Sequence, residues 1–292
     1  MKPMVSCLCC THGRFTVLRE ALACFLMQDH GYRELIILNN HPVPVYLPGG
    51  KNSFCREEPD GEIMEIYIVN EAYDFKTLGE IRQRCLDAAS QHTDYIRPWD
   101  DDDLNMPWAL SDAVAAIGDA PAFKPKRSWT SYADERYELN ENNFEASYLF
   151  DAQLVRDNGY DTSRHSGEQF KLVDAVNRRG GARIVDLGIE TPLVARWENG
   201  LHHVSGGGSG DGKDEERRQL WVERNQDTGE GEYLTPLDPR PRWEALLQDT
   251  LVRFGSLAMT TDGKSEWDAL KTRFEEYKYG DPKRAFRGLT DV

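Results

Sequence analysis

The sequence of 292 residues contains no long apolar run. No segment approaches the roughly 20 consecutive apolar residues that a membrane-spanning helix needs, and residues 1–8 lack the apolar stretch of a secretory signal. Positive charge is also scarce, because 35 lysines and arginines face 50 aspartates and glutamates, for a formal net charge of −15. This balance argues against broad nonspecific binding to nucleic acid or anionic membrane. We therefore expect a soluble, cytoplasmic protein.

The six cysteines do not form the two CxxC pairs that are typical of a closed zinc site. If residues 5–10 form a strand, Cys7 and Cys9 share one face of it while Cys10 points to the other. The remaining thiols lie within apolar patterns. This usage predicts reduced thiols in an intracellular protein.

Short apolar strands alternate with helical patterns in the first half of the chain, which predicts an α/β sheet built from βαβ units. Strands are expected at 5–10, 34–38 and 62–69, and at the apolar run that ends near residue 99. Helices are expected at 15–28 and 77–90. The stretch 41–60 is rich in proline and glycine and is predicted to be a loop.

The last of these strands leads into four consecutive aspartates at 100–103. Four adjacent anions repel one another, so a positive partner is expected. Mg²⁺ or Mn²⁺ would suit this position, because these hard cations take oxygen ligands and keep places open for substrate phosphates. The alternative is an acidic turn that caps the following helix, where aspartate is also favoured.

Polar segments follow three of the expected strands, at 11–14, 39–41 and 100–103. Ligands of open α/β sheets bind outside the carboxyl ends of the strands. The three segments are therefore expected to meet at one edge of the sheet and to form a ligand site there.

These segments, in this order, resemble the family 2-like glycosyltransferases of the GT-A fold. Residues 6–14 are similar to the family's first strand and its P-T-Y-N-R segment, and residues 77–89 to its L-G-x-x-R-N-x-x-x-x-A helix. Residues 99–107 are similar to its D-x-D-D followed by proline. The resemblance implies a Rossmann-like mixed sheet flanked by helices, as a catalytic domain at 1–205. A flexible glycine-rich loop at 206–213 and a helical extension at 214–292 are expected to follow.

The resemblance implies a metal-dependent transferase that moves a sugar, with inversion, from a nucleoside diphosphate sugar to an acceptor hydroxyl. Bound Mn²⁺ or Mg²⁺ would neutralise the diphosphate as it leaves. The acceptor class stays open and includes a saccharide, a lipid, a protein and a modified nucleic acid.

The implied metal ligands are Asp100 and Asp102, with His203 (or its neighbour His202) as a further contact. The implied contacts to the nucleotide sugar lie at the strand ends and on the helix at 77–90: Cys10, Thr11, His12, Arg14, Asn39, Asn40, Arg82, Asp100 and Asp101. If the strand continues past residue 99, Asp101 and Asp103 point away from the metal pair.

Three of these residues carry open questions. Asn39 and Asn40 stand where the family has two aspartates that contact the base, so the nucleobase is left open. Arg82 suits either a phosphate or the acid run, because a guanidinium pairs with both.

Residues 159–170 are similar to the family's segment that carries G-E-D before a helix, where an acid serves inverting members as general base. This chain has Glu168 followed by Gln169, so only Glu168 can ionise. The resemblance therefore implies Glu168 as the base, a role that contributes about 10²- to 10⁴-fold. Asp174 is a reserve, and the alternative for Glu168 is an acid favoured by a helix dipole.

Two other functions remain open. A nucleotidyltransferase would carry a glycine-rich phosphate loop after the first strand, whereas residues 11–14 contain one glycine. A catalytically silent module that binds a nucleotide sugar or glycan is kept open by Asn39, Asn40 and Gln169. Hydrolysis of the donor would exclude the silent module.

Overall fold

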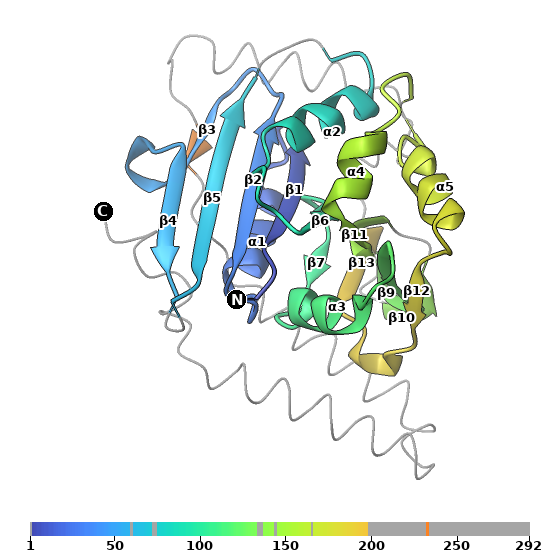
Figure 1. The fold of residues 1–292 in the computed structure, drawn as a ribbon. Coiled ribbons are helices and arrows are strands. Elements are labelled where there is room, and N and C mark those ends of the chain that lie inside the picture. Colours follow the sequence, from blue (N-terminus) through green and yellow to red (C-terminus); the bar gives the residue numbers. More distant parts are fainter. Residues whose placement is uncertain are drawn as a thin grey trace.

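A computed structural model describes residues 2–58, 61–71, 75–132, 137–142, 145–164, 166–197 and 232–233. Its centre is an eight-stranded mixed sheet (Figure 1). The strands are, in spatial order, β12 (Arg183–Val185), β8 (Ala122–Pro125), β11 (Leu149–Asp151), β6 (Tyr95–Pro98), β1 (Val5–Thr11), β2 (Arg33–Asn39), β5 (Ile63–Asn70) and β4 (Ser53–Glu57). β4 and β11 run antiparallel to their neighbours, and the other pairs are parallel. The predicted mixed α/β sheet is confirmed.

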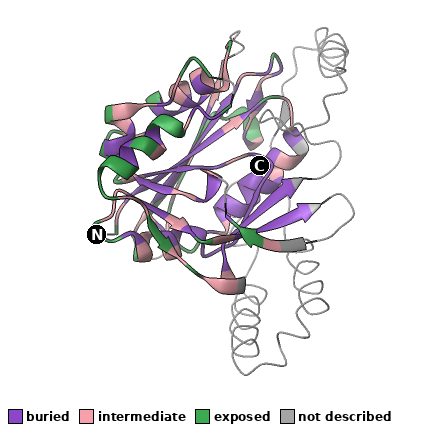
Figure 2. Cartoon of the chain, turned by 90° about the vertical axis from the view of Figure 1, so that its right-hand side faces the viewer, coloured by how far each residue is buried: buried purple, intermediate pink, exposed green. Residues whose placement is uncertain are grey.

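Helices cover both faces of this sheet. They are α1 (Phe15–Leu26), α2 (Leu78–Asp87), α3 (Ala109–Ile117), α4 (Ala152–Asn158) and α5 (Phe170–Arg178). α1 and α3 share one buried cluster with Cys7, Cys9 and Leu35, whereas α2, α4 and α5 share the other with Leu8 and Ile36. The alternation of side chains along β1 and β2 therefore separates the two layers. Figure 2 shows mostly buried strands beside partly exposed helices.

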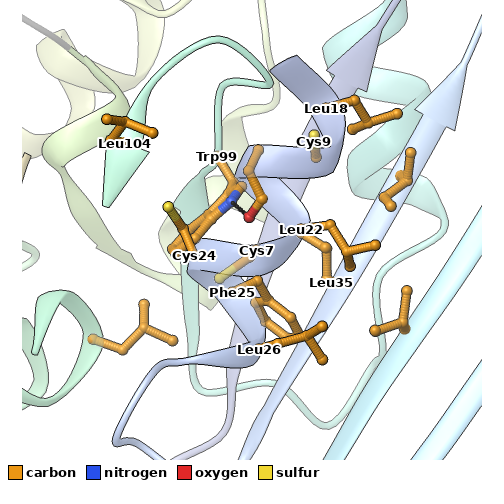
Figure 3. Packing of buried hydrophobic residues seen from close by; sticks show 14 of the residues in the cluster. Cys7, Cys9, Leu18, Leu22, Cys24, Phe25, Leu26, Leu35, Trp99 and Leu104 are labelled. Carbon is orange, nitrogen blue, oxygen red and sulfur yellow. Dashed lines mark hydrogen bonds between the residues drawn. The ribbon is translucent and has the colours of Figure 1, made fainter. Parts of the chain in front are cut away.

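The cluster under α1 contains a tryptophan from the loop that follows β6 (Figure 3). Trp99 is fully buried, and its indole Nε1 donates a hydrogen bond of 3.1 Å to the carbonyl of Ala21 in α1. Its backbone N–H donates to the Leu8 carbonyl at 2.8 Å. A buried indole needs such a partner for its N–H. Together these contacts fix the chain at the point where the acid run begins.

The predicted elements of the first half are present with small shifts at their ends. The helix expected at 15–28 is α1, which ends at Leu26, and the helix expected at 77–90 is α2. Thr77 caps α2 by accepting a hydrogen bond of 3.1 Å from the N–H of Glu80. This is the N-cap contact that favours threonine at such a position.

The prediction of a loop across 41–60 is wrong in part. β3 (Val45–Tyr46), the 3₁₀ turn η1 (Pro48–Gly50) and the edge strand β4 fall inside that stretch. β4 alternates exposed and half-buried residues and pairs with β5, so its strand state depends on a distant partner. Proline and glycine in η1 obscured the strands on either side of it.

A second sheet was not predicted. Its order is β10 (Tyr137–Glu141), β9 (Arg127–Tyr132), β13 (Leu193–Trp197) and β7 (Leu104–Asn105), and a separate pair joins β3 to β14 (Glu232–Tyr233). Two further 3₁₀ turns are η2 (Glu145–Ser147) and η3 (Gly188–Glu190). β7 follows the acid run directly, so the second sheet holds the far end of that run.

Several expectations lie outside the described residues. They concern the loop at 206–213 and, apart from β14, the helical extension at 214–292. Among the helices that the structure does describe, none has the length and apolar character to cross a bilayer.

All six cysteines are free thiols, and Cys55 on the edge strand β4 is the exposed one. Cys7 and Cys9 lie in the cluster beneath α1, while Cys10 packs on the opposite layer, as the strand alternation predicts. Burial raises the pKa of the Cys7 thiol to about 12, so this sulfur is a neutral core group.

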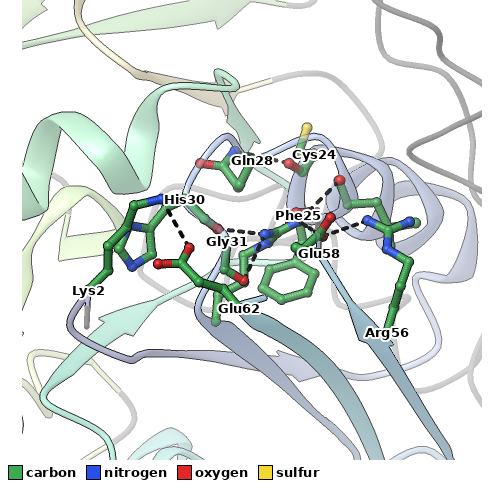
Figure 4. Close-up of polar contacts among 11 residues, drawn as sticks. Lys2, Cys24, Phe25, Gln28, His30, Gly31, Arg56, Glu58 and Glu62 are labelled. Carbon is green, nitrogen blue, oxygen red and sulfur yellow. Dashed lines mark hydrogen bonds and ion pairs between the residues drawn. The ribbon is translucent and has the colours of Figure 1, made fainter. Parts of the chain in front are cut away.

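A buried arginine joins the end of α1 to the start of β2. Figure 4 labels two residues that it contacts, Phe25 and Glu58. The guanidinium of Arg33 donates to the carbonyls of Phe25 and Leu26, each at 3.3 Å, and pairs with Glu58 at 3.3 Å. α1 has no basic residue in its last turn, so Arg33 supplies the positive charge that a helix C-terminus favours. Burial lowers the pKa of Arg33 to about 10, which leaves the group charged at neutral pH.

We predict that Arg33→Met lowers the free energy of unfolding by about 1–3 kcal/mol, because the carbonyls of Leu26 and His30 lose a buried donor, while Glu58 keeps its pair with Arg56. Urea denaturation followed by circular dichroism measures this. Arg84→Met is the control, since Arg84 is 40% exposed and its pair with Glu71 lies at the surface, where such pairs contribute about 0–1 kcal/mol. Equal losses in the two variants would contradict the prediction.

Candidate functional site

The carboxyl ends of β1, β2 and β6 lie side by side, since these strands are parallel neighbours in the sheet. β6 ends at Pro98, and the acid run 100–103 follows the anchored Trp99. The three polar segments that the sequence placed at strand ends therefore meet at one edge, as predicted.

The acid run is a turn and not a continued strand, because the N–H of Asp103 donates back to the Asp100 carbonyl at 3.4 Å. The two-residue alternation is lost, so Asp103 does not point away from the metal pair. Carboxylate oxygens of Asp100, Asp102 and Asp103 lie within 4.8 Å of one another. The expected pair is thus brought together, and a third acid that the sequence did not assign to the metal joins it.

Arg14, the residue before α1, spans two of these acids. Its Nη2 pairs with Asp101 and its Nη1 with Asp102. Burial raises the pKa of Asp101 to about 6, while the Arg14 guanidinium acts in the opposite direction. Arg14 thus pairs with Asp102, a carboxylate that the sequence analysis expects to bind the metal.

Arg82, on α2, faces the outer end of the run. Its Nη2 donates to Asp100 at 3.0 Å, and its Nε lies 2.8 Å from the carboxylate of Glu168. The side chain is 10% exposed. Of the two roles expected for Arg82, pairing with the acid run is the one that the structure displays.

Gly79 explains how α2 comes close enough to bring Arg82 to Glu168. A Cβ at position 79 would lie 2.0 Å from the backbone carbonyl oxygen of Asp161, so only glycine fits there. The Gly79 N–H donates to the Arg164 carbonyl at 3.0 Å. The glycine thus lets α2 pack on the segment that leads to Glu168.

Arg196, on β13, holds the run from the second sheet. Its backbone N–H donates to Asp103 at 3.1 Å, and its guanidinium donates to the Asp102 carbonyl and to Glu20 of α1. Burial raises the pKa of Asp103, and the neighbouring Asp102 and Asp100 add to the shift. Sequence reasoning missed Arg196 and Glu20, since no motif links residues so far apart.

The acid run fits a hard divalent cation. It offers three carboxylates in close range, and the Oδ2 atom of Asp101 is buried without a hydrogen-bond donor in the described part of the chain. Oxygen ligands of this kind suit Mg²⁺ or Mn²⁺. His203 lies outside the described residues, so its expected contact to the metal stays a prediction.

The strand-end residues expected at the nucleotide divide into two groups. His12 is exposed and lies 3.0 Å from the side-chain oxygen of Asn40, whereas Thr11 and Asn39 are buried and Cys10 is half-buried. The Asn39 amide donates to the Val43 carbonyl at 2.8 Å and to the Asn70 side chain at 3.0 Å. Asn39 therefore holds the loop after β2, and the structure does not test its contact to a base.

The two acids considered as general base lie in different environments. Glu168 is 2% exposed and pairs with Arg82. Asp174 lies on the exposed side of α5, which buries Leu172 and Val176. The structure thus places Glu168, and not Asp174, beside the acid run.

Glu145 is a further acid of this site that the sequence did not reveal. It begins η2, which packs against β6, and its Oε1 is buried without a hydrogen-bond donor among the described residues. Burial raises the pKa of Glu145 to about 8, with Glu168 and Asp100 adding to the shift and Arg82 opposing it. No motif covers residue 145, so only the fold could reveal it.

Comparisons with known proteins show the fold. No protein-family profile matches the chain, and a search of curated proteins finds no match. The solved structure of S. aureus TarS 1-349 in complex with UDP-GlcNAc is similar at a TM-score of 0.50 and 13% identity, over 97% of this chain and 89% of that chain. The mannosyltransferase PcManGT from Pyrobaculum calidifontis, in complex with GDP-Man and Mn²⁺, gives 0.44 and 13%, over 95% and 86%. The likeness to TarS confirms the predicted GT-A fold.

We predict that Arg14→Met tightens Mn²⁺ binding by about tenfold in the absence of nucleotide, because Arg14 and a cation compete for the Asp102 carboxylate. Electron paramagnetic resonance of free Mn²⁺ measures the affinity. Arg164→Met is the control, since Arg164 is 51% exposed and pairs with Asp161 away from the run. Unchanged or weaker Mn²⁺ affinity in the Arg14 variant would show that the two do not compete.

Proposed function

We propose that this chain is a metal-dependent, inverting glycosyltransferase that moves a sugar from a nucleoside diphosphate sugar to an acceptor hydroxyl. The observation that carries the proposal is the meeting of three carboxylates within 4.8 Å at the end of β6, in a GT-A fold, between Arg14 and Arg82. The complex of TarS with UDP-GlcNAc, which has the same fold, supports a nucleotide sugar as donor.

The residues of the acid run suit this chemistry. Cleavage of the bond between sugar and diphosphate develops negative charge on the leaving group. A Mn²⁺ or Mg²⁺ ion held by Asp100 and Asp102, with Asp103 and His203 as further ligands, would neutralise that charge. Arg14 and Arg82 already lie at the run and would bind phosphate oxygens through the same N–H groups.

The nucleoside is proposed to lie over the ends of β1 and β2. His12 and Asn40 are accessible there, and Cys10, Thr11 and Asn39 form the floor beneath them. Amides at 39 and 40 add no charge to an edge that already holds several acids. A direct contact to the base is therefore proposed for Asn40, and a supporting role for Asn39, whose amide is engaged by Val43 and Asn70.

Inversion requires a base within reach of the acceptor hydroxyl. The resemblance points to Glu168, which pairs with Arg82 beside Asp100. The proposed base is thus one of the two glutamates near Arg82, Glu168 or Glu145. The acceptor is proposed to be a saccharide, lipid or protein of the cytoplasm, since the net charge of −15 disfavours nucleic acid.

A second candidate function is a silent module that binds a nucleotide sugar without transferring it. Gln169 favours it, because this residue stands where the family has the aspartate of G-E-D. Release of nucleoside diphosphate from a donor by the purified protein separates the two functions, since the silent module would bind the donor and leave it intact.

We predict that one nucleoside diphosphate among UDP, GDP, CDP, ADP and TDP binds in the presence of Mn²⁺ and not in EDTA, and that Asp102→Ala weakens this binding by at least about tenfold. The physical reason is the loss of a shared ligand between protein, cation and phosphate. Isothermal titration calorimetry measures both effects.

Asp174→Ala is the matched control, because it removes an exposed acid of α5. Binding that survives EDTA, or that is equal in the Asp102 and Asp174 variants, would count against a metal site at the acid run.

A further inference from the structure

Two buried polar groups near Arg82 lack hydrogen-bond partners among the residues that the structure describes. The Oε1 atom of Glu145 and the hydroxyl of Tyr160 are both buried, and neither has a hydrogen-bond partner within the described ranges. The Tyr160 side chain is 3% exposed. Such groups are rare in folded proteins, because an unmade hydrogen bond leaves the cost of desolvation uncompensated. Together they point to a ligand or water that both groups contact.

Glu145 and Tyr160 belong to one electrostatic cluster. Arg82 of α2, Glu168 before α5 and Asp100 after β6 all act on the pKa of Glu145. Glu145 in turn acts on the pKa of Tyr160 and of its own neighbour Tyr148. Arg82 pairs with Asp100 and Glu168 and acts on the pKa of Glu145 and of Tyr160.

Arg82 divides its contacts unequally among the acids. It lies 3.0 Å from Asp100 and 2.8 Å from Glu168, whereas Glu145 forms no ion pair within the described part of the chain. Glu168 is also closed to solvent at 2% exposure, while Glu145 is half-buried. Of the two glutamates, Glu145 is the one that has a carboxylate oxygen without a hydrogen-bond partner among the described residues.

Building on the proposed glycosyl transfer, we propose that Glu145 takes the proton of the acceptor hydroxyl, that Tyr160 hydrogen-bonds to the same hydroxyl, and that Glu168 positions Arg82. The acceptor oxygen attacks the anomeric carbon, and the bond from that carbon to the diphosphate oxygen breaks. Its electron pair leaves with the nucleoside diphosphate. The proton of the hydroxyl passes to Oε1 of Glu145 and then to solvent. Water in place of the acceptor gives donor hydrolysis by the same step.

The protonation of Glu145 suits this role. Burial, Glu168 and Asp100 raise its pKa to about 8 against the effect of Arg82. A base works best when its pKa lies near the operating pH. Since the carboxylate form is the active one, the rate rises with pH through this range and levels off above it.

The test uses the full chain with Mn²⁺ and follows release of UDP from UDP-GlcNAc and of GDP from GDP-mannose, with donor affinity measured in parallel. Glu145→Gln is expected to lower turnover by about 10²- to 10⁴-fold and to leave donor affinity within about threefold. Glu168→Gln, by contrast, is expected to weaken donor affinity in addition to lowering turnover, because Arg82 loses a partner. Glu141→Gln, an exposed acid of β10, is the matched control with unchanged turnover.

The outcomes separate the inference from the proposed function. If no donor binds and none is cleaved, the proposed function fails and the inference falls with it. If donor is bound and cleaved and Glu145→Gln turns over at the wild-type rate, the proposed function stands and the inference is overturned. Loss of turnover in Glu168→Gln with unchanged donor affinity, beside an active Glu145 variant, would assign the base to Glu168 instead.

A second measurement serves in case Glu145→Gln does not fold. The pH profile of donor cleavage by the wild-type protein is expected to rise about tenfold per unit below the pKa of Glu145, near pH 8. A profile that is flat between about pH 6 and 8.5 overturns the inference.

The same group predicts a pH dependence of stability. The folded protein keeps a proton on Glu145 up to about pH 8, whereas an unfolded glutamate loses it near its ordinary value of 4.5. Between these values the folded state binds more protons, so the Glu145 contribution to stability is present at low pH and is lost as the pH rises through 8. We expect the thermal unfolding temperature of Glu145→Gln to rise relative to that of the wild-type protein from pH 5 to pH 9. If the unfolding temperatures of the two proteins change in parallel with pH, the raised pKa of Glu145 is contradicted.

Discussion

The rest of this structure depends on how the charge of one acid turn is balanced. Four successive carboxylates are held by arginines from three different elements: Arg14 before α1, Arg82 on α2 and Arg196 on β13. Because each arginine comes from a separate element, the turn fastens both helical layers and the second sheet to the end of β6. A buried anion requires such pairing, since desolvation without it is very costly.

The sequence predicts the helices and strands that have a local pattern, and it does not predict those that depend on contacts with distant residues. β5 alternates with a period of two, α1 and α2 have helical patterns, and β1 and β2 are short apolar runs. The acid run and its following proline are close together in the sequence, so all of these could be predicted. The second sheet consists of short strands whose partners lie far away along the chain. The contact of Arg196 with Glu20 spans 176 residues, and no local pattern could announce it.

Asn39 illustrates how a motif position can change its use. The family resemblance places a base-contacting aspartate there, whereas in the structure this amide donates to Val43 in the loop after β2 and to Asn70 at the end of β5. An aspartate at position 39 would add a negative charge at the edge of the sheet that already holds the acids after β6. An amide provides the geometry of a carboxylate without its charge, so the substitution favours the loop and leaves recognition of the base to neighbours.

The distribution of thiols means that their reactivity reports local opening of the fold. Four cysteines are sealed in the two layers, at 7, 9, 24 and 85, while Cys55 stands on the edge strand in contact with solvent. An alkylating reagent meets Cys55 in the native state, whereas the sealed sulfurs react only during excursions that separate helix from sheet. Mass spectrometry of the modified peptides would then give the alkylation rate of each buried cysteine, and so how often each helical layer separates from the sheet.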